Sequence, residues 1–182
     1  HFYEVRARNP QDLTDLGRAA RLVYLNRTCF NGLYRVNSKG LFNVPFGRYK
    51  NPTIVQEQRL WAVHRALQGV EIEEAPYASV LEHAKKGDLV YFDPPYDPLS
   101  ASSSFTSYAR SSFGADQQRE LAEVFGQLDR AGVLVMLSNS DTPLINELYK
   151  HFVIKPMQAA RAINSKADRR TPITELLVLG KT

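Results

Sequence analysis

The chain has 182 residues and a net charge of +4, and its 23% charged and 43% apolar residues are ordinary for a soluble globular protein. No apolar run reaches the length of a membrane span, and a single cysteine, Cys29, excludes an internal disulfide and a cysteine-rich zinc site. We therefore expect a soluble protein without a membrane partner or a metal, in a reducing compartment such as the cytoplasm.

The N-terminal part of the chain predicts two helices separated by a region of turns. Apolar residues at helical spacing predict a helix over 12–25, with Asp12 capping its start. Glycines and a proline break the pattern between residues 26 and 51, where we expect turns and a hairpin near 37–40. A second helix is predicted over 53–67, with one apolar face formed by Leu60, Val63 and Leu67.

Strands and helices alternate in the rest of the chain. The predicted strands are 70–72, 89–92, 133–138, 152–157 and 175–180. The predicted helices are 78–86 ended by Gly87, 116–130 with Leu121, Val124, Phe125 and Leu128 inward, and 142–150. This order predicts crossover units and a largely parallel sheet. A Ser-rich loop is expected at 100–112. A basic loop at 161–170, with no helix, is expected to join the last two strands as an antiparallel pair, which makes the sheet mixed.

A basic and aromatic segment lies between residues 16 and 56, where the chain has no Asp or Glu. Six aromatic rings alternate there with seven basic residues: Arg18, Arg21, Arg27, Arg35, Lys39, Arg48 and Lys50. This pattern suits a polyanion with bases that can stack, such as a nucleic acid. A solvated basic surface over a local aromatic core gives the same pattern, and composition does not separate the two.

The strand predicted over 89–92 runs directly into Asp93, Pro94, Pro95 and Tyr96. In open α/β sheets ligands bind beyond the carboxyl ends of the strands. Neither proline has an N–H, so a carboxylate and carbonyl acceptors form a stiff shelf there. Such a shelf accepts hydrogen bonds from the NH₂ group of a base, which stacks on the tyrosine after flipping out of a duplex. The alternative is a proline-rich turn in which Asp93 caps the backbone.

This tetrad, DPPY, resembles motif IV of the amino-group methyltransferases that use S-adenosylmethionine. The upstream segment LNRTCFNGLYRVNSKGLFNVPFGRYKNP (25–52) is similar to the target-recognition region of Dam-type DNA adenine-N6 methyltransferases. SNSDT (138–142) and RAINSKADRRTPITELL (161–177) are similar to later blocks of that family, in the family's order.

The resemblance implies an α/β fold, a Rossmann-like class I methyltransferase sheet that is mixed through an antiparallel last strand, with a small DNA target-recognition subdomain. We expect residues 1–25 to begin the methyltransferase core, 26–68 to form the recognition subdomain, and 69–182 to form the catalytic core.

The resemblance also assigns roles to particular residues. It implies that Asp93, Pro94, Pro95 and Tyr96 hold a flipped adenine, and that Asp93 lies near the methyl-bearing end of the cofactor. It implies double-stranded DNA with a GATC-like site as the partner. The DNA-facing positions that it implies are Phe30, Asn31, Leu33, Arg35, Pro45, Arg48, Tyr49 and Lys50. The alternative for Phe30 and Tyr49 is that they are core residues. The alternative for Arg48 and Lys50 is a solvated surface.

The cofactor implied by the resemblance is S-adenosyl-L-methionine. Besides Asp93, the contacts expected to it are Tyr77 and Ser79, for which a helix start with an N-cap is the alternative. The family's chains begin with a block and a glycine-containing turn that are not found here, and the chain starts at His1. We therefore expect that an N-terminal segment or a companion chain completes the cofactor site.

Three hypotheses remain open from the sequence. The first is a DNA adenine-N6 methyltransferase, as found in restriction–modification systems, or the larger part of one. The second is a DNA-binding remnant that does not catalyse methyl transfer. The third is an RNA or protein amino-group methyltransferase that uses the same tetrad.

Overall fold

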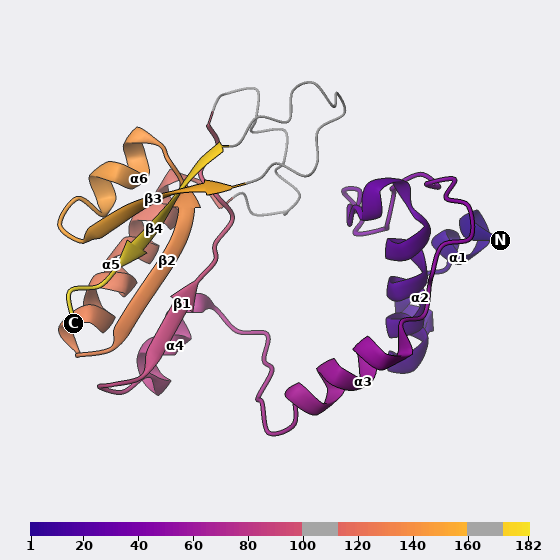
Figure 1. Cartoon of the computed structure of the whole chain (residues 1–182), viewed down its shortest axis with the longest axis horizontal. Helices are drawn as coiled ribbons and strands as arrows, with labels where there is room; N and C mark the ends of the chain where they lie inside the picture. Colours follow the sequence, from indigo (N-terminus) through magenta and orange to yellow (C-terminus); the bar gives the residue numbers. More distant parts are fainter. Residues whose placement is uncertain (100–112, 160–172) are drawn as a thin grey trace. The chain divides into compact units, whose positions relative to one another are not determined.

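The computed structural model describes residues 1–99, 113–159 and 173–182 (Figure 1). The loops expected at 100–112 and 161–170 lie outside the described residues. The contacts divide the chain into two compact units, His1–Glu73 and Glu74–Thr182, which we call the N-terminal unit and the C-terminal unit. Within the described residues, no helix has the length and apolar character needed to cross a membrane.

The N-terminal unit is helical with one irregular segment. Its elements are α1 (Phe2–Ala7), the short turn η1 (Pro10–Asp12), α2 (Asp15–Thr28), the turn η2 (Phe30–Gly32) and α3 (Glu57–Ala66). One apolar cluster holds α1, the end of α2 and the irregular segment together: Phe2, Val5, Leu25, Cys29, Phe42 and Val44. Residues 1–25 therefore share an apolar core with part of the recognition segment.

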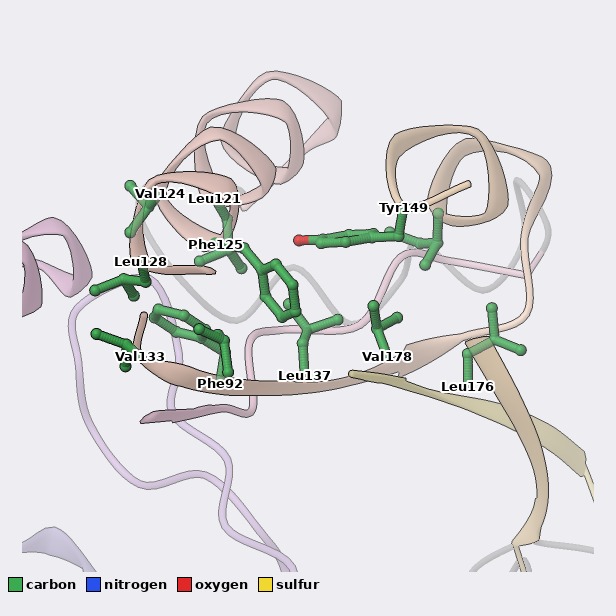
Figure 2. Packing of buried hydrophobic residues seen from close by; sticks show 12 residues of the cluster. Phe92, Leu121, Val124, Phe125, Leu128, Val133, Leu137, Tyr149, Leu176 and Val178 are labelled. Carbon is green, nitrogen blue, oxygen red and sulfur yellow. The ribbon is translucent and has the colours of Figure 1, made fainter. Parts of the chain in front are cut away.

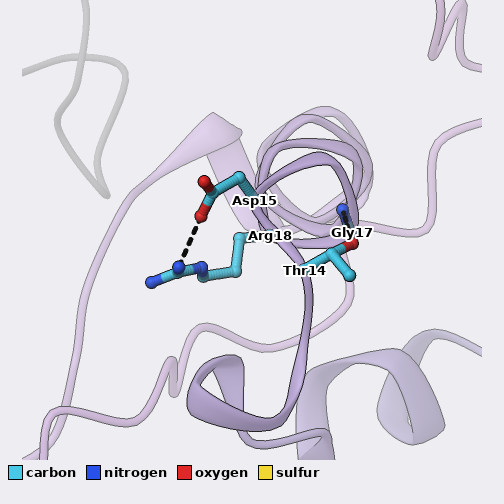
Figure 3. Close-up of polar contacts among 4 residues, drawn as sticks. All are labelled: Thr14, Asp15, Gly17 and Arg18. Carbon is cyan, nitrogen blue, oxygen red and sulfur yellow. Dashed lines mark hydrogen bonds and ion pairs between the residues drawn. The ribbon is translucent and has the colours of Figure 1, made fainter.

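Helix α2 begins at Asp15, so the prediction that Asp12 caps it is wrong. Thr14 is the cap, because its Oγ1 accepts a hydrogen bond from the N–H of Gly17 at 3.2 Å (Figure 3). Asp12 instead ends the η1 turn. Arg18 pairs with Asp15 across the first turn of α2 and adds an exposed ion pair there.

Helix α3 and its surroundings differ from the prediction in three ways. The helix starts at Glu57, because residues 53–55 are a Thr-Ile-Val run of β-branched side chains that disfavour helix. Leu60, Val63 and Leu67 are exposed by about half rather than buried. The strand predicted at 70–72 is absent from the described residues, where Val70 and Ile72 are exposed and pair with no strand.

The hairpin predicted near 37–40 is confirmed. Val36 and Phe42 pair as an antiparallel bridge, and the N–H of Asn37 donates to the carbonyl of Leu41 at 2.9 Å. Gly40 takes a φ of +75° in the turn, which glycine adopts without a side-chain clash.

In the described residues, the C-terminal unit contains a sheet of four strands, and this sheet is mixed, as predicted. Its strands are β1 (Leu89–Phe92), β2 (Leu134–Ser140), β3 (Val153–Ala159) and β4 (Ile173–Leu179), in the order β1-β2-β4-β3. Strand β1 runs parallel to β2, and β4 is antiparallel to both β2 and β3. The last two strands thus form the expected antiparallel pair, with β4 inserted beside β2.

Helices α5 (Ala115–Arg130) and α6 (Pro143–Leu148) pack on one face of this sheet. Figure 2 shows side chains of α5 above Phe92, Leu137 and Val178 of the sheet. The four residues predicted to point inward from α5 are all buried: Leu121, Val124, Phe125 and Leu128. Helical spacing therefore identified this core correctly.

The segment before the sheet is shorter and less buried than predicted. Helix α4 (Val80–His83) follows the turn η3 (Tyr77–Ser79) and ends before Gly87, which is not its C-cap. Strand β1 is buried on one face only, because Phe92 faces the core while Leu89 and Tyr91 are 62% and 55% exposed. The described helices cover one face of the sheet, so alternate residues of β1 remain in contact with solvent.

Tyr149, which follows α6, is fully buried, and no described residue hydrogen-bonds its hydroxyl. Burial raises the pKa of this hydroxyl well above that of a free tyrosine. Its ring packs edge-on against Phe125, a contact that Tyr149→Phe keeps. Because an unpaired buried hydroxyl costs about 1–3 kcal/mol, we expect Tyr149→Phe to leave the free energy of unfolding in urea unchanged or raised. A loss above about 1 kcal/mol would contradict this and indicate a partner for the hydroxyl.

Candidate functional site

The carboxylate of Asp93 stands at the carboxyl end of β1, next to β2. The register that pairs Phe92 with Leu137 brings Asp93 beside Ser138. The hydroxyl of Ser138 donates to Asp93 Oδ1 at 2.9 Å and accepts from the hydroxyl of Tyr91 at 2.9 Å. No described residue donates to Oδ2, and Asp93 is exposed, so one carboxylate oxygen is oriented while the other is accessible.

The loop after Asp93 is also held from the helix-covered side of the sheet. The carbonyl of Pro95 accepts from Gln118 Nε2 at 2.9 Å, and the N–H of Asp97 donates to Asn139 Oδ1 at 2.9 Å. Ser138 and Asn139 are consecutive in β2, so they point to opposite faces of the sheet. Ser138 therefore holds Asp93, the first residue of the tetrad, and Asn139 holds Asp97, the residue that follows the tetrad.

Tyr96 is half-buried between these two sets of contacts. Burial raises the pKa of its hydroxyl, the adjacent Ser138 acts in the opposite direction, and the nearby carboxylates of Glu175 and Asp93 raise the pKa further. Tyr96 is therefore a neutral phenol at physiological pH, with an uncharged ring beside the carboxylate.

Tyr77 and Ser79 lie in the η3 turn of the same unit. The Tyr77 hydroxyl donates to Glu120 Oε2 at 3.3 Å, and its ring meets Phe113 edge-on. Ser79 donates its hydroxyl to the carbonyl of Pro76 at 2.8 Å and caps no helix with its side chain. The polar groups of both side chains thus have local partners, and their role toward a cofactor stays a prediction.

The recognition segment of the N-terminal unit folds back on itself beside the end of α2. The N–H of Phe30 donates to the carbonyl of Pro45 at 2.9 Å, and Cys29 pairs with Phe46 as a bridge. Gly47 is required here, because a Cβ on it would lie 2.6 Å from the carbonyl oxygen of Cys29. Phe30 and Pro45 are therefore neighbours on one surface.

Most of the predicted DNA-facing residues are exposed on this unit. Phe30 and Tyr49 are 47% and 45% exposed, so neither is a core residue. The others that are exposed are Asn31, Pro45, Arg48 and Lys50, whereas Leu33 is partly buried against the unit's apolar cluster.

Several of these residues line a hollow of about 440 Å³. Asn31, Tyr49 and Lys50 line it together with Arg27, which the sequence had placed only in the basic segment. A hollow with two cations and an aromatic ring offers contacts for a phosphate and a base.

Part of the basic segment also makes contacts that hold the fold together. Arg21 donates to the carbonyls of Val5 and Arg6 at 3.0 and 2.8 Å, which ties α1 to α2. Arg35 donates its Nε to Asn43 Oδ1 at 2.6 Å and its Nη2 to the Asn43 carbonyl at 3.2 Å. These bonds fix the direction of the Arg35 guanidinium, and its remaining N–H groups are those that can meet a base.

Three non-glycine residues of this segment have a left-handed backbone: Asn31, Arg48 and Asn51, with φ of 54°, 55° and 48°. For arginine this conformation costs roughly 1–2 kcal/mol. Such strain concentrates at functional sites, where the surrounding structure maintains it.

Sequence reasoning gave no role to Tyr91, Ser138, Gln118 or Asn139. The signal for two of them was present, since Gln118 and Asn139 are polar residues at positions whose periodicity faces the core. Among the described residues, no group of three or more His, Cys, Asp or Glu side chains is arranged to hold a metal ion.

The fold is that of a class I methyltransferase. Its sheet is mixed, with the antiparallel strand β4 beside β2, and the tetrad 93–96 follows the parallel strand β1. Comparison with known proteins identifies the family within this class. Residues 1–163 match the family of D12 class N6 adenine-specific DNA methyltransferases, and the chain belongs to that family.

Individual relatives cover nearly the whole chain. It is 47% identical to the type II methyltransferase M1.LlaDCHI of Lactococcus lactis subsp. cremoris. The alignment spans 168 residues and covers 91% of this chain and 59% of that protein. It is 46% identical to the type II methyltransferase M.MjaIII of Methanocaldococcus jannaschii, over 98% of this chain and 63% of the relative. It is 38% identical to the DNA adenine methylase of Escherichia coli K12, in an alignment that covers 99% of this chain and 64% of that protein. The chain thus spans about three fifths of the length of these relatives.

Proposed function

We propose that the protein transfers a methyl group from S-adenosylmethionine to N6 of adenine in double-stranded DNA, at a GATC-like site. The observation that carries this proposal is the exposed carboxylate of Asp93 at the carboxyl end of β1, which Ser138 orients through Oδ1. The family and the relatives named DNA adenine methylase support the choice of DNA and adenine.

The carboxylate of Asp93 and the proline carbonyls that follow it suit an exocyclic amine. The nitrogen of such an amine is a poor nucleophile, because its lone pair is delocalised into the ring. A carboxylate oxygen of Asp93 and a proline carbonyl that accept its two hydrogens favour the tetrahedral, nucleophilic form. Gln118 already donates to the Pro95 carbonyl, so the Pro94 carbonyl, which receives no hydrogen bond from the described residues, is the acceptor that we assign. Tyr96 then stacks on the flipped base.

The residues of this chain fit the cofactor in part. When bound, S-adenosylmethionine supplies an electrophilic methyl group on a positively charged sulfur. The negative charge of Asp93 complements that cation, and the ring of Tyr77 offers a face for an adenine ring. Ser79, in the same turn, is the third residue that we place at this ligand.

The N-terminal unit would supply the contacts to the duplex. We assign Phe30 as the wedge between base pairs, Asn31 as the residue filling the gap, and Arg35 as the reader of a guanine edge, with Leu33 and Pro45 beside it. Arg48, Tyr49 and Lys50 suit the phosphate backbone, which positions the duplex without specifying its sequence. A protein acting on chromosomal DNA works where that DNA lies, so the cytoplasmic location is part of the proposal.

Arg48→Gly should separate stability from DNA binding. Glycine accepts the left-handed backbone, so we expect a free energy of unfolding that is unchanged or higher by up to about 1 kcal/mol. Loss of one phosphate contact should weaken binding to all duplexes alike and reduce the slope of log K against log salt by about 0.9. Fluorescence anisotropy with labelled duplexes at several salt concentrations, together with urea unfolding, measures both.

Arg48→Ala is the matched control, because it removes the charge and keeps the strain. It should match Arg48→Gly in DNA binding and be the less stable of the two. A salt slope unchanged in both variants would remove Arg48 from the phosphate contacts.

The proposed function is tested with the protein in the full length that its gene encodes. It is incubated with S-adenosylmethionine and duplexes that contain or lack GATC, and N6-methyladenine is measured by mass spectrometry. We expect product from the GATC duplex. DNA binding without product, and without cofactor binding in calorimetry, would favour a non-catalytic DNA-binding protein. Product from RNA alone would favour an RNA methyltransferase.

A further inference from the structure

Two buried amide side chains lie beneath the loop that carries Tyr96. Gln118 comes from the first turns of α5 and Asn139 from β2, and both are fully buried. Asn139 Nδ2 donates to Gln118 Oε1 at 3.1 Å. The pair joins helix and sheet at the point where the tetrad leaves β1.

The orientation of both amides is fixed by their partners. The backbone N–H groups of Asp97 and Ser140 lie 2.9 and 2.8 Å from the same atom of Asn139. An N–H only donates, so that atom is the oxygen Oδ1, and Nδ2 faces Gln118. The facing atom of Gln118 is then its oxygen, which directs Nε2 to the carbonyl of Pro95, a group that only accepts.

The two ends of this chain of hydrogen bonds lie on either side of one residue. Gln118 holds the carbonyl of Pro95, and Asn139 holds the N–H of Asp97, so the backbone is fixed immediately before and after Tyr96. A buried amide without its partners costs about 1–3 kcal/mol, whereas an apolar pair of similar size would pack this core without that risk. The amides therefore differ from an apolar pair in that they fix the backbone of Pro95 and Asp97, and not in the stability that they add.

We propose that Gln118 and Asn139 are positioning residues for Tyr96, which set the place of its ring against the target base. This inference rests on the proposed function, because it assumes that Tyr96 stacks on a flipped adenine. Neither amide is placed in contact with the base. They act through the loop, where a displacement of about 1 Å is enough to cost up to a hundredfold in rate.

Gln118→Met is the first test variant, since methionine has a similar length and shape but donates no hydrogen bond. It leaves the Pro95 carbonyl free while Asn139 still holds Asp97. Val124→Ala, in the same helix and the same core but with a side chain that makes no hydrogen bond, is the control for lost stability. Both are compared with the wild type in the full length that the gene encodes, at a temperature where thermal melts show each to be folded.

Two readouts separate positioning from stability. The first is kcat and KM for a GATC duplex, and the second is the fluorescence change on binding of a duplex with 2-aminopurine in place of the target adenine. For Gln118→Met we expect kcat to fall about ten- to a hundredfold, KM for DNA to change less than about threefold, and the fluorescence change to be at least halved. Val124→Ala should keep the wild-type kcat and fluorescence change.

Asn139→Asp is a second variant of nearly identical shape, which covers the case that Gln118→Met does not fold. In its ionised form the carboxylate still accepts from Asp97 and Ser140 but cannot donate to Gln118, so we expect Gln118 to turn its Nε2 toward the carboxylate and away from Pro95. We expect the same loss in kcat and in fluorescence change as for Gln118→Met.

The outcomes are distinct. If the wild type makes no N6-methyladenine, the proposed function fails and the inference fails with it. If the wild type is active and the amide variants match Val124→Ala in both readouts, the inference alone is overturned.

Discussion

Asp93→Ala is expected to lower the rate of methyl transfer to adenine by about a thousandfold or more, equivalent to about 4 kcal/mol of transition-state stabilisation. Binding to duplex DNA should change by less than about threefold, because the assigned phosphate contacts lie elsewhere in the chain. The rate is measured in single-turnover experiments with enzyme in excess over a GATC duplex, and the affinity by anisotropy.

The size of this effect follows from the contacts of Asp93. Its Oδ1 already accepts from Ser138, which in turn accepts from Tyr91, so the carboxylate is oriented before any ligand arrives. An acceptor that is already in place costs no reorganisation when the amine nitrogen becomes tetrahedral and its hydrogens more positive. Alanine removes both the carboxylate acceptor and the negative charge. The assigned Pro94 carbonyl still accepts one hydrogen of the amine, but it carries no charge.

Two milder variants grade the effect. Asp93→Asn keeps the shape and one acceptor oxygen without the charge, so its rate should lie between those of the wild type and Asp93→Ala. Ser138→Ala keeps the carboxylate and removes its donor, for which we expect about a tenfold loss, since one hydrogen bond to a charged group contributes about 1.5–3 kcal/mol. An Asp93→Ala rate above a tenth of the wild-type rate would refute the role given to this carboxylate.

The parts of the fold that were predicted correctly are those in which several neighbouring residues indicate the same element. Helix α5 carries four large apolar residues at helical spacing from Leu121 to Leu128, and the hairpin at 37–40 is bounded by turn residues, so both are found where expected. The parts that failed had a weak signal. Residues 70–72 are apolar in alternation, but a strand needs a neighbour, and the sequence pattern does not say whether one is available.

The site was predicted in the same uneven way. Asp93 and Tyr96 were found because prolines and an acid after an apolar strand are unusual, and because that tetrad resembles a known motif. The residues that hold the tetrad were missed, because Gln118 is 23 positions from Pro95 and Asn139 is 42 positions from Asp97. Only the packing of α5 on β2 brings them together, although a polar residue on an apolar face was a usable signal.

Phe125→Ala is expected to cause the largest loss of stability, about 3–5 kcal/mol in the free energy of unfolding. Phe125 is fully buried at the centre of the core between α5 and the sheet. Its ring meets Tyr149 and Phe152 edge-on, with centroids 5.3 and 4.8 Å apart, and each such contact adds about 0.5–1.5 kcal/mol beyond the buried area. The loss is measured by urea denaturation followed by circular dichroism.

Gln127→Ala, on the exposed side of the same helix, is the matched control and should change stability by less than about 0.5 kcal/mol. Because single domains are stable by only about 5–15 kcal/mol, Phe125→Ala should remove a large share of the margin. It should also reduce activity in proportion to the folded fraction, unlike Asp93→Ala, which is expected to stay folded because Asp93 is exposed. A loss below about 1 kcal/mol for Phe125→Ala would mean that α5 does not rest on the sheet through this ring.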